Sequence, residues 1–234
     1  MDTCKEKNMN SEFSVNGRMV TVFKADNPCS PAVYLNSYGD EEGEKVWQEL
    51  KNSRVDVNLI VISSLDWNCD MSPYSAPSVF RHAHDFSGGA AKYLGLLTEN
   101  IIPAAEEITG PVKWRGIAGY SLAGLFALYS LFMTDAFSRC ASVSASLWYP
   151  GFSSFAAQHE MMVRPQCIYF SLGDRECRTR NPVLSTVQSE TENIVALMER
   201  RGIPAVFRLN EGGHHDNPVL RTADGISWIT SFRP

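Results

Sequence analysis

The second half of the chain alternates between short apolar runs, typical of strands, and longer segments with helical spacing. Strand-like runs lie at 114–120 and 167–174, and helical patterns at 122–133 and 183–202. This alternation predicts an α/β fold with a mostly parallel, twisted sheet and helices on both faces. Such sheets bind their ligands beyond the carboxyl ends of the strands. Candidate functional residues should therefore follow those runs.

The same alternation extends toward the N-terminus. Further strands are predicted at 18–23, 32–36, 57–65, 140–149 and 205–210, and further helices at 42–50, 88–108 and 225–232. The proline-containing stretch 66–77 is expected to be an irregular loop, and residues 1–12 a flexible N-terminus. No repeat or linker interrupts the 234 residues, of which 44% are hydrophobic, so residues 1–234 are predicted to form one domain.

Composition excludes several classes of partner. The net charge is −5 and basic residues form no run, so no nucleic-acid partner is expected. The polar start and the lack of a long apolar stretch predict a cytoplasmic protein without a membrane partner. The six cysteines have irregular spacing, which favours free thiols over disulfides. Whether the chain forms a homo-oligomer is left open.

The stretch GYSLAG, residues 119–124, places Ser121 between a predicted strand and a predicted helix. It is close to the G-x-S-x-G nucleophile elbow, although the final glycine is shifted by one residue to Gly124. The elbow needs small neighbours, and Gly119 and Ala123 meet that need. A serine in this position can also cap a helix. On this motif alone both interpretations stay open.

Two further predicted strands end in groups that could complete a catalytic set. Asp174 and Glu176 follow the strand at 167–174, and His214 and His215 follow the strand at 205–210. Each group alone has an ordinary structural explanation, as a turn residue or a loop histidine. The order serine, acid, histidine is the order of α/β hydrolases. Together they favour a serine hydrolase.

The chain resembles the esterase D/putative esterase branch of the α/β-hydrolase fold, which includes S-formylglutathione hydrolases and enterobactin-type siderophore esterases. It is most similar to a bacterial subgroup of small members. The matching stretches, which span about residues 31–232, are DWNCDMSPYSAP, FSGGAAKYL, IAGYSLAGLFALY, SVSASLWYPGF, SLGDRECRTRNP and NEGGHHDNPVLRTADGISW. The resemblance implies a single α/β-hydrolase domain, and it implies Ser121 as the nucleophile. No insertion is long enough to form a separate lid domain, so none is expected.

The family pattern also bears on the acid and the histidine. Its G-x-x-D/E spacing, counted from Gly173, implies Glu176 rather than Asp174. Asp174 would then fix its loop, with Arg175 or Arg178. The family's E-G-G-H pattern implies His214, whereas E-G-x-x-H would select His215, which stands where an aromatic residue is usual.

The resemblance implies hydrolysis of a small-molecule carboxylic ester through an acyl-enzyme, without a cofactor. The backbone N–H of Leu122 and that of Ser37 or Tyr38 would hold the oxyanion. Four aromatic residues are candidates for the substrate pocket or for covering the core edge: Trp67, Tyr74, Trp148 and Tyr149.

Three other functions remain as alternatives. A thioesterase or acyltransferase would use the same triad, and a non-catalytic α/β-hydrolase-fold protein would use the site for binding only. A metal enzyme could draw on HAHD (82–85) and HHD (214–216). The H-x-H motif has no third ligand at a defined spacing, so no metal is expected.

Overall fold

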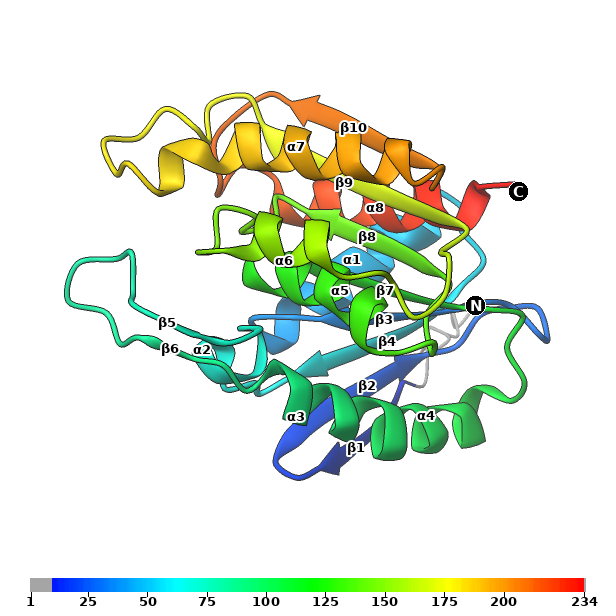
Figure 1. Ribbon diagram of the computed structural model, residues 1–234. Coiled ribbons are helices and arrows are strands. Elements are labelled where there is room, and N and C mark those ends of the chain that lie inside the picture. Colours follow the sequence, from blue (N-terminus) through cyan, green and yellow to red (C-terminus); the bar gives the residue numbers. More distant parts are fainter. Residues whose placement is uncertain (1–9, 234) are drawn as a thin grey trace, which may run out of the picture.

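Eight strands form one sheet in the computed structural model, which describes residues 10–233 (Figure 1). The strands are β1 (Ser11–Val15), β2 (Arg18–Phe23), β3 (Ala32–Asn36), β4 (Asn58–Ser63), β7 (Arg115–Tyr120), β8 (Arg139–Val143), β9 (Cys167–Gly173) and β10 (Ala205–Asn210). Their order is β1-β2-β4-β3-β7-β8-β9-β10. β2 pairs antiparallel with β1 and β4, and every other pair is parallel. The predicted mostly parallel sheet is confirmed.

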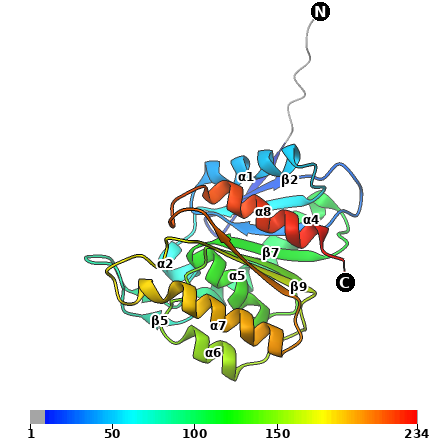
Figure 2. The same ribbon diagram turned by 90° about the horizontal axis from the view of Figure 1, so that it is seen from above.

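Helices cover both faces of this sheet (Figure 2). The helices are α1 (Asp40–Asn52), α3 (Ala90–Leu96), α4 (Ile102–Thr109), α5 (Leu122–Met133), α6 (Phe152–Gln158), α7 (Val187–Arg200) and α8 (Pro218–Ser231). α1 and α8 share one hydrophobic cluster with one face of the sheet, and the other helices belong to a cluster on the opposite face. α5 is buried from Leu122 to Phe132, as its apolar sequence predicts.

The first hairpin corrects one expectation. Residues 1–9 of the predicted flexible segment 1–12 lie outside the described residues, but Ser11 and Glu12 pair with β2. Asn16 and Gly17 connect the two strands with φ of 46° and 77°. An Asn-Gly pair with positive φ at both residues is typical of a two-residue β-hairpin turn. Ser11 and Glu12 are therefore part of the sheet and not of a flexible segment.

Larger differences from the predictions occur in three other places. β8 ends at Val143 rather than at 149, because Ser144 has a φ of 41° and turns the chain out of the sheet. α8 begins at Pro218 rather than at 225. The predicted loop 66–77 contains the short helix α2 (Trp67–Asp70) and β5 (Ser75–Ala76), which pairs with β6 (Phe86–Ser87).

The helical region predicted at 88–108 is continuous but changes its pitch. A π-helical segment, Leu97–Ile101, joins α3 to α4. Pro103 lies in the first turn of α4 and has no N–H to donate. Within residues 10–233, no helix combines the length and the apolar character that crossing a membrane requires. The five cysteines of this range are free thiols.

Candidate active site

Ser121 makes the whole turn between β7 and α5. β7 ends at Tyr120 and α5 begins at Leu122, and between them Ser121 has φ 60° and ψ −124°. A non-glycine residue held in such a conformation costs about 1–3 kcal/mol, which the surrounding structure must supply. The side chain makes no capping hydrogen bond to α5. The geometry is therefore that of an elbow and not of a helix cap.

Small residues leave the space that this turn needs. A Cβ on Gly119 would lie 2.3 Å from the carbonyl oxygen of Ala123, and one on Gly124 would lie 2.8 Å from the Cβ of Ala145. Ala123 is tolerated because Gly119 opposite it has no side chain. The shifted glycine is needed at position 124, where α5 packs against the chain that follows β8.

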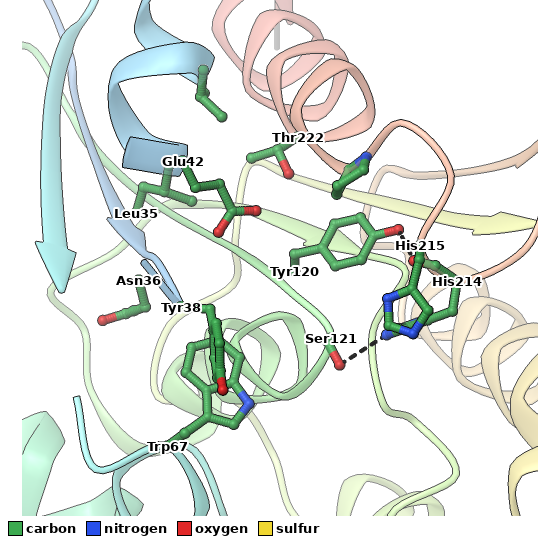
Figure 3. A pocket seen from close by; sticks show the side chains of 12 residues that line it. Leu35, Asn36, Tyr38, Glu42, Trp67, Tyr120, Ser121, His214, His215 and Thr222 are labelled. Atoms are coloured by element: carbon green, nitrogen blue, oxygen red, sulfur yellow. Dashed lines mark hydrogen bonds between the residues drawn. The ribbon is translucent and has the colours of Figure 1, made fainter. Parts of the chain in front are cut away.

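A chain of hydrogen bonds leads away from Ser121. Its Oγ lies 3.1 Å from Nε2 of His214, and Nδ1 of His214 lies 2.7 Å from Oε2 of Glu176 (Figure 3 shows the first contact). Glu176 follows β9 and His214 follows β10, so both reach Ser121 from neighbouring strand ends. The carboxyl side chain is 2% exposed and the imidazole 32%. The structure thus brings these three side chains together.

The two alternative residues lie outside this chain of bonds. Asp174 is exposed, and its Oδ1 accepts a hydrogen bond from the backbone N–H of Gly212 at 2.8 Å. It fixes the loop that carries His214, but through the backbone rather than through Arg175 or Arg178. His215 is exposed, and its ring lies 5.2 Å from that of His214. Neither residue hydrogen-bonds to the Ser121–His214–Glu176 chain.

Behind Glu176 lies a buried cation that sequence reasoning missed. Arg221 of α8 is 3% exposed, and its Nη1 lies 3.1 Å from Glu176 Oε1. The same nitrogen donates to Oγ of Ser144 at 3.2 Å and to the hydroxyl of Tyr120 at 3.3 Å. Tyr120 in turn donates to the backbone oxygen of His214 at 2.6 Å. Arg221 therefore supports both the carboxylate and, through Tyr120, the histidine.

The hydrogen bonds from His214 and from the backbone of Gly173 keep the Glu176 carboxylate ionised. Burial alone would raise the pKa of Glu176, because it disfavours the charged form. The hydrogen bond from His214, the charge of that ring and the backbone N–H of Gly173, 2.6 Å from Oε1, outweigh the burial and hold the pKa of Glu176 below its ordinary value. An ionised carboxylate at Nδ1 leaves Nε2 facing the serine as the acceptor.

The structure distinguishes between Ser37 and Tyr38, the two predicted oxyanion donors that follow β3. The N–H of Ser37 already donates to the carbonyl of Ile62 at 2.9 Å and is not free. Within residues 10–233, the N–H groups of Tyr38 and Leu122 have no backbone acceptor. The first N–H groups of a helix lack partners inside the helix. Tyr38 and Leu122 are thus the available pair, and Ser37 is not.

Two cavities meet at Ser121 and His214. The larger, about 470 Å³, has Tyr38, Trp67 and Glu42 in its walls (Figure 3). The smaller, about 220 Å³, is bounded by Trp148 together with apolar side chains of the loops at 77–85 and 174–186. These two loops are joined, because the side-chain amide of Asn181 donates to the backbone oxygen of Val79 at 2.7 Å. Trp67 and Trp148 therefore line the two cavities, as candidate pocket residues should.

The other two candidate pocket residues do not reach these cavities. Tyr149 is 2% exposed, and its hydroxyl donates to the backbone oxygen of Tyr74. The hydroxyl of Tyr74 donates to the backbone oxygen of Pro150 at 2.8 Å, and the two rings pack edge to face. The expectation that they line the pocket is wrong. The chain turns out of the sheet at Ser144, so Tyr149 packs under the loop instead of facing a ligand.

A known family covers most of this chain. The model of the family described as "Putative esterase" matches residues 31–219. The chain belongs to this esterase family. The chain is similar in sequence to the "Uncharacterized protein YbbA" of Bacillus subtilis strain 168. The two are 23% identical over 237 residues, which cover 94% of this chain and 95% of that one.

Solved structures share the fold of this esterase-family chain. An IroE-like serine hydrolase from Shewanella oneidensis superposes with a TM-score of 0.78 at 15% identity, over 94% of this chain and 79% of that one. The siderophore hydrolase EstB from Aspergillus nidulans gives 0.72 at 18% identity, over 100% and 99%. At such identities the similarity concerns the fold, a single α/β-hydrolase domain.

The sequence contains a weak signal for Arg221, the buried residue of this esterase-family site that was not predicted. Arg221 is the single basic residue of α8, and Asp224 is the one other charged residue of this helix. Charged residues are almost never fully buried unless they are paired, so a basic residue on a buried face points to an acidic partner. Within residues 10–233, no group of three or more His, Cys, Asp or Glu side chains is arranged to hold a metal ion.

Proposed function

We propose that this chain is a serine carboxylic-ester hydrolase that acts on a small-molecule ester through an acyl-enzyme. The observation that carries the proposal is the continuous chain of hydrogen bonds from Ser121 through His214 to Glu176, which starts at an elbow facing two cavities. Membership of the esterase family supports the same chemistry.

In the proposed reaction Ser121 Oγ attacks the ester carbonyl carbon while its proton passes to Nε2 of His214. The tetrahedral intermediate collapses, the carbonyl carbon–oxygen bond to the alcohol breaks, and His214 returns the proton to the leaving alcohol. A water molecule then repeats the sequence on the acyl-enzyme and releases the acid. Glu176 orients the imidazole and stabilises its protonated form throughout.

The N–H groups of Leu122 and Tyr38 are proposed to hold the oxyanion. Leu122 follows Ser121 directly, Tyr38 lines the same cavity as Ser121, and neither N–H has another acceptor within the described chain. Donors that are fixed before the reaction stabilise developing charge without reorganising, and each is worth about 10²–10³-fold in rate. Tyr38 is preferred to Ser37 as the second donor, because the N–H of Ser37 already donates to the carbonyl of Ile62.

A fluorophosphonate probe tests the proposal. It should label the wild-type protein at Ser121 and fail to label Ser121→Ala. Ser146 provides a matched control. Its hydroxyl lies 3.4 Å from that of Ser121, so it is an alternative site for labelling by the probe. Ser146→Ala should still be labelled. An unlabelled native wild type, or a Ser121→Ala variant with full activity on p-nitrophenyl acetate, would disprove the serine mechanism.

A further inference from the structure

The larger cavity beside Ser121 combines aromatic side chains with a single carboxylate. Tyr38, Trp67 and Tyr120 contribute the aromatic rings, and Glu42 comes from the first turn of α1. Figure 3 shows the Glu42 carboxylate directed into the cavity, toward the space between Tyr38 and Tyr120. A ligand that fills this space would meet negative charge and aromatic side chains together.

The charge of Glu42 is not matched by the protein around it. Neither cavity is lined by a lysine or an arginine. Among residues 10–233, no basic side chain lies within ion-pair distance of Glu42, and its polar contact is the hydroxyl of Ser37 at 3.1 Å. Glu176 differs, because both His214 and Arg221 bind it. The helix dipole explains why a carboxylate is tolerated at the start of α1. It does not explain why this one faces the cavity.

A substrate must displace water from this carboxylate. A neutral group leaves its charge poorly compensated, and an anionic group is repelled by it. A cationic group regains the lost solvation, and an alkylammonium also interacts favourably with the faces of Trp and Tyr rings. The surroundings of Glu42 are therefore suited to an ammonium ion.

We propose that this cavity binds an alkylammonium group of the ester, while the smaller cavity takes an apolar portion. The smaller cavity is assigned to the apolar portion because its lining includes Phe80, Trp148, Leu184 and Val187. The substrate class is thus an ester with a cationic group on one side of the carbonyl and an apolar group on the other. This inference rests on the proposed function, in which Ser121 is the nucleophile between the cavities.

Binding tests the cation site independently of turnover. Choline and 3,3-dimethylbutan-1-ol have nearly the same shape and differ in one positive charge, so their dissociation constants, measured by NMR titration, isolate that charge. Choline should bind the wild type about five- to tenfold more tightly, as expected for a half-exposed charge pair with aromatic neighbours. Glu42→Gln should bring the ratio near one. Glu44→Gln, an exposed position on the same helix, should keep the wild-type ratio and controls for net charge.

Turnover then tests the site in catalysis. One matched pair of esters is acetylcholine and 3,3-dimethylbutyl acetate, with the charge on the alcohol side. The other is the p-nitrophenyl esters of 4-(trimethylammonio)butanoic and 5,5-dimethylhexanoic acids, with the charge on the acyl side. In one of the two pairs, kcat/KM of the cationic ester should exceed that of its neutral partner about fivefold. The ratio should fall to about one in Glu42→Gln.

The outcomes separate the two proposals. Equal binding of choline and its neutral analogue by the wild type, or a preference that survives in Glu42→Gln, overturns the cation site whatever the turnover. If none of the four esters is cleaved faster by the wild type than by Ser121→Ala, the hydrolase proposal fails, and the NMR titration still decides the cation site. A thermal unfolding midpoint close to that of the wild type shows that Glu42→Gln is folded.

Discussion

The two sides of His214 differ in burial and in bonding. Behind the ring, Glu176 and Arg221 are 2% and 3% exposed and are hydrogen-bonded to each other. In front of it, Tyr38 is 75% exposed and Glu42 has no cationic partner within the described chain. The difference separates what must be rigid from what must accept a ligand. A change behind the ring should lower the rate for every ester, whereas a change in front should alter which ester is preferred.

The largest effect is expected at the histidine itself. His214→Ala should lower kcat/KM on p-nitrophenyl acetate by about 10⁴-fold or more, because the serine loses its base. His215→Ala is the matched control and should stay within about tenfold of the wild type, since its side chain lies outside the hydrogen-bonded chain. Steady-state kinetics of both variants decide the point. The reverse ranking would move the base to His215.

The acid should follow with a somewhat smaller effect. Glu176→Gln keeps the shape of the side chain but removes the charge that stabilises the protonated imidazole, and it should lower kcat by about 10²–10⁴-fold. Asp174→Asn weakens only the acceptor for the N–H of Gly212, so kcat should fall less than in Glu176→Gln. The loss in kcat should vary with temperature, because the loop that carries His214 is held less firmly. Equal losses in kcat at 25 °C would contradict the assignment of Glu176.

Arg221 should matter less for rate and more for stability. Arg221→Met leaves a buried carboxylate with His214 as its remaining ionic partner, and the free energy of unfolding should drop by about 3 kcal/mol. The kcat for all esters should fall by about tenfold, with KM nearly constant, if Arg221 positions the acid. Arg221→Lys keeps the charge but not the planar fork, so it should recover only part of both losses. A stability loss without any change in kcat would limit Arg221 to a structural role.

A change in front of the ring should redistribute preference instead of removing activity. Trp67→Leu removes an aromatic wall of the larger cavity and the edge-to-face contact with Tyr38 at 5.1 Å. KM should rise about three- to tenfold for esters with a bulky group, and kcat/KM for p-nitrophenyl acetate should change less, because a small ester does not fill the cavity. A uniform loss for large and small esters would place Trp67 with the supporting network.

Sequence reasoning was most effective where local chemistry determines structure. The apolar runs predicted the parallel strands, and the bounds of α5 agree with the predicted 122–133. The small neighbours of Ser121 fit an elbow, and the carboxylates and histidines that follow the next two strands favour the nucleophile over a helix cap. Only the family spacing favoured Glu176 and His214 over Asp174 and His215. The two carboxylates are two residues apart and the two histidines are adjacent, so local sequence alone does not distinguish between them.

Long-range contacts account for what was not predicted. Arg221 reaches Glu176 across 45 residues of chain, and Tyr120 reaches the backbone of His214 across 94. No local pattern encodes such contacts. Tyr74 and Tyr149 were misplaced for a related reason, since the turn at Ser144 redirects the chain before Tyr149. Buried polar groups and loops after strands are thus the features that a single sequence describes least well.

The smallest effect concerns stability in acid. The pKa of Glu176 lies below its ordinary value in the folded protein, so its ionised form stabilises the fold above the unfolded-state pKa, about 4.3 for glutamate. That contribution is lost as the pH falls through the lower folded-state pKa. The difference in unfolding free energy between the wild type and Glu176→Gln should therefore be constant near neutrality and shrink below about pH 4. Urea unfolding at a series of pH values measures it. A difference that stays constant down to pH 2.5 would mean that His214 and the N–H of Gly173 do not hold the carboxylate ionised, and the supporting side of the site would then be no more specialised than the open one.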